Sequence, residues 1–237
     1  AYGAASFLAM IVAWFAVKET KGLGTSVGLG AGASISFLRQ IKLLMGQVGF
    51  VLVSIISLVN AVTRTGGLFT IVPVFAAVHL ALSVAEIGTG MALGSVFGLL
   101  AAYPTGMLVD RFGRKAVIVP ATLITGAAML LFMVAPGYAW FVVACVVWGI
   151  AATVGGTAPA AYAADSAPPG MNAAAMSTFR MVGDIGYVIG PIALGFLVDT
   201  QGAETALVVT AALSVVAGML FLKFAPESYS GSARQRD

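Results

Sequence analysis

The chain has 237 residues, of which 60% are hydrophobic and only 9% charged, and its mean hydropathy is +1.02. A soluble domain carries about 25% charged residues because its surface faces water, so this composition excludes an ordinary soluble domain and predicts an all-α polytopic membrane protein whose main partner is the lipid bilayer. The net charge of +3 arises from 12 Lys and Arg against 9 Asp and Glu, without the basic stripe that nucleic-acid binding requires.

Seven apolar segments with few charges follow one another along the chain: 4–17, 46–78, 86–108, 116–134, 139–163, 171–198 and 204–222. A helix needs about 20 residues to cross the hydrocarbon core. The first segment is shorter than this, so we expect residues 1–17 to be a truncated transmembrane helix. The other six predict a bundle of six spans over residues 46–223, followed by a tail at 224–237.

Residues 18–45 connect the first segment to the second. The glycine-rich run from Gly22 to Gly32 has the composition of a flexible linker. After it, apolar residues recur at helical spacing and two basic residues lie on another face: Ile35, Leu38, Ile41 and Met45 against Arg39 and Lys42. This pattern predicts either a short helix on the inner membrane surface or an extension of the next span.

The second segment contains Arg64-Thr65-Gly66-Gly67, which fits either a tight turn between two spans or a position within one long helix. With one helix, ten of the twelve Lys and Arg residues fall on the same side of the membrane and the other two, Arg64 and Arg180, lie inside spans. A turn would separate the basic clusters. Because basic residues concentrate in cytoplasmic loops, we predict one helix, a cytoplasmic C-terminus and a location in the plasma (inner) membrane.

Small residues recur at four-residue spacing on two of the predicted spans. Gly90, Gly94 and Gly98 share one helix face, and Gly186 and Gly190 share another. Such spacing lets helix backbones approach closely in lipid. Pro191 predicts a kink, because proline lacks the backbone donor and clashes with the preceding turn.

The loop between the third and fourth segments carries a dense motif: Gly106, Asp110, Arg111, Gly113, Arg114 and Lys115. One interpretation is that this charged loop only fixes the topology of the chain in the membrane. Its spacing, however, resembles the loop signature of the major facilitator superfamily, whose members have twelve helices in two six-helix halves. The signature lies between the second and third helices of each half. The resemblance implies that these residues form a gating loop, in which Asp110 meets a helix terminus of the opposite half.

Two further stretches resemble the same family. The run containing Gly186, Gly190, Pro191 and Gly195 is similar to the glycine-proline motif of the fifth or eleventh helix, and Ala161 to Pro169 is similar to the end of the tenth. The fourth helix of a first half usually carries an arginine, and Trp140 to Tyr162 has no charged residue. We therefore expect the C-terminal half, resembling helices six to twelve. The partner is an N-terminal six-helix half, from the same gene or a separate polypeptide.

Three charged residues lie deep within predicted spans, Arg64, Arg180 and Asp184, and Asn60 lies one turn before Arg64. A charge near the bilayer centre costs at least about 2.5 kcal/mol, so each needs a partner or a water-filled cavity. Arg180 and Asp184 are four residues apart and share a helix face, which fits an internal ion pair. The alternative is that the four residues line a substrate or proton pathway. Asp184 is the only acidic residue predicted to lie deep in the membrane, and therefore the best candidate for proton coupling.

We find no pattern of metal ligands, no nucleophile with a base and no phosphate-binding loop, so we predict neither an enzyme nor a cofactor. The leading hypothesis is a secondary transporter working by alternating access on a small-molecule substrate. Efflux of a small amphiphile by proton antiport is the favoured subclass, which the resemblance to drug-efflux members of the family and the apolar spans imply. The alternative is a non-transporting membrane subunit or assembly factor derived from the same fold.

Overall fold

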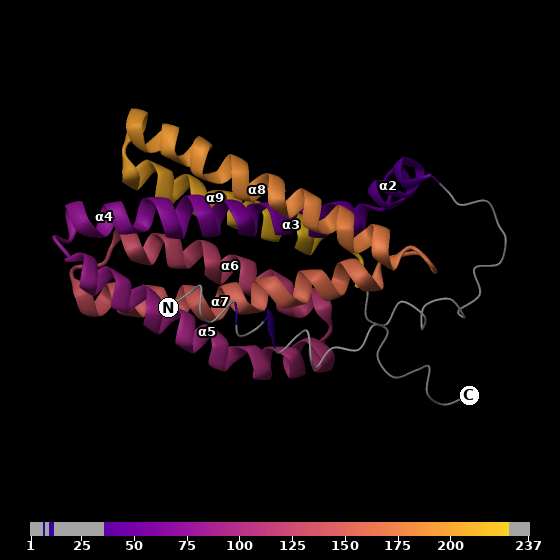
Figure 1. Cartoon of the computed structure of the whole chain (residues 1–237), viewed down its shortest axis with the longest axis horizontal. Helices are drawn as coiled ribbons and strands as arrows, with labels where there is room; N and C mark the ends of the chain where they lie inside the picture. The colour runs from indigo at the N-terminus through magenta and orange to yellow at the C-terminus, as the bar shows by residue number, and fades with distance from the viewer. Residues whose placement is uncertain (1–6, 8–9, 12–35, 228–237) are drawn as a thin grey trace. The chain divides into compact units, whose positions relative to one another are not determined.

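The computed structural model describes residues 7, 10, 11 and 36–227, and those from Ser36 onward form one compact unit. Within this unit, six helical segments are long and apolar enough to cross a membrane (Figure 1): Val48–His79, Val84–Phe112, Arg114–Met133, Tyr138–Asp165, Asn172–Gln201 and Ala203–Phe224. They match the six predicted spans. The predicted segment 4–17, the linker and most of the C-terminal tail lie outside the described residues.

A short helix, α2 (Phe37–Met45), precedes the first span. Gln47 has the extended conformation (φ −93°, ψ 117°), so the chain turns before α3 (Val48–Val62) begins. The helix at 37–45 is therefore separate from the span and not an extension of it. Its Leu44 is fully buried, while Phe37 and Leu38 are exposed, as expected for a helix that offers an apolar surface to a membrane.

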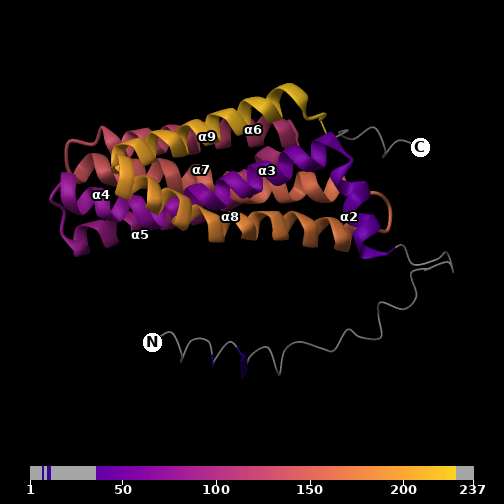
Figure 2. The same cartoon turned by 90° about the horizontal axis from the view of Figure 1, so that it is seen from above.

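The spans pack side by side (Figures 1 and 2). Helix α7 (Tyr138–Asp165) lies against α5 (Val84–Phe112) and α6 (Arg114–Met133), while α9 (Ala203–Phe224) lies against α6 and α3. Helix α8 (Asn172–Gln201) packs on the first span. Buried apolar residues form two clusters, one around Phe50 and Tyr162 and the other around Phe132 and Phe141.

Helices α5 and α7 cross at glycines. A Cβ atom added to Gly94 would lie 2.5 Å from the carbonyl oxygen of Cys145, and one added to Gly98 would lie 2.7 Å from that of Gly149. One added to Gly90 would meet the ring of Phe141. The predicted glycine face is therefore a site of close backbone contact, which only residues without a side chain allow.

The first span is continuous from Val48 to His79, which confirms one helix rather than a turn at Arg64. Its middle, however, is a π-helix, η1 (Thr63–Ile71), which joins α3 to α4 (Val72–His79). The N–H of Val72 donates to the carbonyl of Gly67, five residues earlier. Proline at position 73 has no N–H to offer the carbonyl four residues before it, so an α-helical pattern cannot continue unbroken here.

Candidate functional site

A cavity of about 260 Å³ lies among four of the spans. Its lining from the first span follows a helical face: Ser57, Asn60, Ala61 and Arg64. Its lining from α8 does the same: Met176, Phe179, Arg180, Gly183, Asp184 and Tyr187. Helix α7 contributes Trp148, Ala152 and Gly155, among others. The structure thus brings all four predicted pathway residues, Asn60, Arg64, Arg180 and Asp184, to one cavity; their role in transport stays a prediction.

The ion pair that the spacing of Arg180 and Asp184 allows is absent from the described part of the chain. Arg114 forms ion pairs there with Asp110 and Asp165, whereas Arg180 and Asp184 do not pair with each other. Arg180 and Asp184 are both exposed and line the cavity separately. A spacing of four residues places two side chains on one face, but it does not require their charged groups to touch. The structural interpretation of this pair is therefore not supported.

Asn60 has a specific partner across the cavity wall. Its Nδ2 donates a hydrogen bond of 2.9 Å to the carbonyl oxygen of Gly155 on α7. A Cβ atom on Gly155 would lie 3.3 Å from that nitrogen. The small residue at position 155 therefore lets the amide reach the backbone, and the bond ties the first span to α7 at the cavity.

Sequence reasoning did not find Trp148. The residue is only 8% exposed and lines the cavity. Its Nε1 is buried and has no hydrogen-bond partner among the described residues. Buried donors without a partner are rare, because leaving one unpaired costs about 1 to 3 kcal/mol. A tryptophan within an apolar helix is not recognised from sequence as a cavity-lining residue, since the same residue is equally typical of a core or of a membrane interface.

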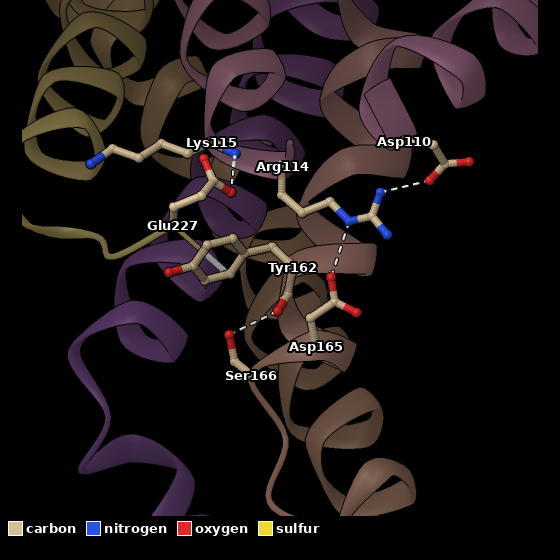
Figure 3. A network of polar contacts seen from close by, with 7 residues as sticks. All are labelled: Asp110, Arg114, Lys115, Tyr162, Asp165, Ser166 and Glu227. Carbon is tan, nitrogen blue, oxygen red and sulfur yellow. Dashed lines mark hydrogen bonds and ion pairs between the residues drawn. The ribbon is translucent and has the colours of Figure 1, made fainter. Parts of the chain in front are cut away.

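The predicted gating loop forms a polar network at one end of the bundle (Figure 3). Arg114 begins α6, and its guanidinium bonds Asp110 near the end of α5 at 2.8 Å and Asp165 at the end of α7 at 3.0 Å. A positive charge at a helix start and negative charges at helix ends are each unfavourable with the helix dipole. Their mutual pairing offsets this cost and joins three helix ends.

Lys115 joins the same loop to the chain after α9. Its Nζ donates to the carbonyl oxygen of Ala225 at 2.6 Å, and its backbone N–H donates to Glu227 at 3.3 Å. The hydroxyl of Tyr162 donates to the carbonyl of Pro226 at 2.7 Å. The segment 225–227 is thereby held against the loop and α7. From sequence, Glu227 belongs only to the predicted tail at 224–237, because nothing in a linear pattern pairs it with a loop over a hundred residues earlier.

The glycines of the predicted motifs have different surroundings. Gly113 has a φ of +89°, a conformation that favours glycine, and joins α5 to α6. Gly186 and Gly190 meet the first span: added Cβ atoms would lie 2.5 Å from the carbonyl oxygen of Leu58 and 2.9 Å from Cα of Val62. Gly106 and Gly195 have nothing within 4 Å of such an atom.

The other residues of the predicted motifs are a proline and an arginine. Helix α8 continues through Pro191. Arg111 lies 5.6 Å from the ring of Phe112.

The sequence profile of the Major Facilitator Superfamily matches residues 53–237. The chain belongs to this family. It is an integral membrane protein with six candidate spans among residues 36–227, and its family consists of membrane transporters and not of enzymes, as the sequence predicted. The all-α fold of the six spans in this described region is consistent with half of the family fold.

Curated relatives agree with this assignment. The chain is 30% identical over 136 residues to "Multidrug resistance protein MdtG" of Citrobacter koseri, covering 56% of this chain and 33% of that protein. It is 29% identical over 162 residues to "Na(+), Li(+), K(+)/H(+) antiporter" of Planococcus maritimus, covering 64% of this chain and 38% of that protein. An uncharacterized MFS-type transporter of Methanocaldococcus jannaschii is 23% identical over 162 residues, covering 68% of this chain and 42% of that protein. The chain thus spans about a third to two fifths of these relatives.

Proposed function

We propose that the chain is the C-terminal half of a proton-coupled secondary transporter that moves a small organic solute by alternating access. The observation that carries the proposal is the convergence of Asn60, Arg64, Arg180 and Asp184 from two spans on one cavity. Charged groups at membrane depth are costly and mark substrate or ion pathways. Binding between two rocking halves is how transporters with such folds work.

Export is the direction that we propose. It is supported by the name of one relative, a multidrug resistance protein, and by that of another, a cation/proton antiporter. The partner in this proposal is an N-terminal six-helix half, which would close the other side of the cavity. In this proposal, the loop with Asp110, Arg111, Arg114 and Lys115 lies in the cytoplasm and acts as a gate. Its ion pairs involve partly exposed side chains, so they can break and reform during gating.

Transport can be tested without knowing the substrate. The complete protein that contains this sequence is placed in everted membrane vesicles, a proton gradient is imposed, and accumulated small solutes are identified by untargeted mass spectrometry. Vesicles carrying the Asp184→Asn variant at equal protein level are the control. We expect at least one organic solute to accumulate only with the parent protein and the gradient. If no solute moves, the alternative of a non-transporting subunit is favoured and the proposal fails.

A further inference from the structure

We propose that the solute taken by this cavity is a small amphipathic organic anion, such as an aromatic sulfonate or carboxylate. The inference rests on the proposed transport function and adds the charge class of the substrate. Of the described residues that line the cavity, the charged ones are Arg64, Arg180 and Asp184, so the lining has a net charge of +1.

Both guanidinium groups are available to a ligand. Within the described part of the chain, neither Arg64 nor Arg180 forms an ion pair, because the ion pairs there involve Arg114. Each side chain is exposed in this half and lines the cavity. Arginine offers paired N–H donors that match the oxygens of a carboxylate, sulfonate or phosphonate. Asp184 balances only one of the two positive charges.

The two arginines come from different elements that are held closely together. Arg64 belongs to η1 and Arg180 to α8. Two residues after Arg64, a Cβ atom on Gly66 would lie 2.7 Å from the carbonyl oxygen of Gly190 on α8. This backbone contact fixes the separation of the two helix backbones that carry the arginines.

The remaining lining indicates an apolar, preferably aromatic, body on the anion. Phe179 and Met176 come from α8, and Trp148 comes from α7 as part of the same lining. An inorganic anion would gain nothing from these side chains, whereas an aromatic ring buries its apolar surface against them.

The experiment compares three probes of similar size and different charge: benzenesulfonate, trimethylphenylammonium and benzenesulfonamide. Equilibrium binding is measured on the complete protein in lipid nanodiscs, and counterflow of each labelled probe is measured in proteoliposomes. We expect benzenesulfonate to bind at least about tenfold more tightly than the cation and the neutral probe, since each charge-assisted hydrogen bond stabilises a complex by an amount worth tenfold or more.

Variants identify the site. Arg64→Gln and Arg180→Gln should each weaken benzenesulfonate binding at least about tenfold, and the lysine variants at the same positions should restore part of it because they keep the charge. Asp184→Asn should tighten binding by removing the negative charge from the lining. Arg39→Gln on α2, outside the cavity lining, is the matched control and should leave binding unchanged.

Several results would overturn the anion assignment. These are equal or tighter binding of the cation or the neutral probe, unchanged anion binding in both glutamine variants, weaker anion binding in Asp184→Asn, or no binding of any probe. None of these would touch the transport function, which the untargeted vesicle assay decides independently. Conversely, tight binding of benzenesulfonate without solute movement in vesicles would retain the anion site and reject the transporter.

Discussion

The crossing of α5 and α7 predicts that Gly94→Ala destabilises the protein although alanine is the better helix former. The added Cβ atom would lie 2.5 Å from the carbonyl oxygen of Cys145, whereas ordinary contact begins at 3.4 Å. The two backbones must therefore separate by roughly 0.9 Å, or the crossing must tilt. Overpacking of this kind costs about 1 to 3 kcal/mol. The higher helix propensity of alanine offsets up to about 1 kcal/mol of this cost.

The matched control is Gly88→Ala on the same helix, where an added Cβ atom meets nothing within 4 Å. Both variants gain the same propensity, so their difference isolates the crowding. We expect Gly94→Ala to melt about 2 to 12 °C below Gly88→Ala, from 2 to 4 °C per kcal/mol for a chain of this size. The measurement is thermal unfolding in detergent followed by size-exclusion chromatography. Equal melting temperatures for the two variants would refute the close contact at Gly94.

Three other predictions follow from the cavity and the loop. Asp184→Asn in the complete protein should bind substrate but lose accumulation driven by a pH gradient in liposomes; accumulation like that of the parent would exclude Asp184 as the coupling site. A double-mutant cycle of Arg114→Gln with Asp165→Asn should give a coupling free energy of no more than about 1 kcal/mol, since the pair is partly exposed, while transport falls more than stability; parallel losses would indicate a purely structural pair. Gly106→Cys in a Cys145→Ala background should react with an impermeant maleimide only after the membrane is permeabilised, and reaction in intact cells would reverse the proposed topology.

The spans and the cavity residues could be predicted from sequence because each depends on a strong local cost. Lipid excludes unpaired backbone groups, so long apolar runs must be helices. Charges are so costly in lipid that Arg64, Arg180 and Asp184 had to lie away from it, and a cavity is one of few places that accepts them. The positions of these charged residues along the chain were therefore sufficient to propose that they line the same cavity.

The features that could not be predicted from sequence have two causes: some depend on contacts between distant segments, and others on local conformations that several patterns allow. The π-helix at Thr63–Ile71 follows from local features, Gly66 and Gly67 with a proline soon after, but the same features also fit a turn. The bonds from Lys115 to the segment after α9 join residues far apart in the chain. The absence of an ion pair between Arg180 and Asp184 reflects rotamer choice in an open cavity, which spacing alone does not determine.

The glycines and the charges of α8 belong to one arrangement. Gly183, Gly186 and Gly190 form a stripe that meets the first span, with added Cβ atoms at 2.7 Å from Ser57 Oγ, 2.5 Å from the Leu58 carbonyl and 2.9 Å from Val62 Cα. Arg180 and Asp184 lie on the adjoining face and line the cavity. Because the stripe allows no room between the backbones, it sets how far the α8 backbone stands from the helix that carries Arg64. The small residues, which carry no chemistry themselves, thereby define the geometry in which the charged ones can act.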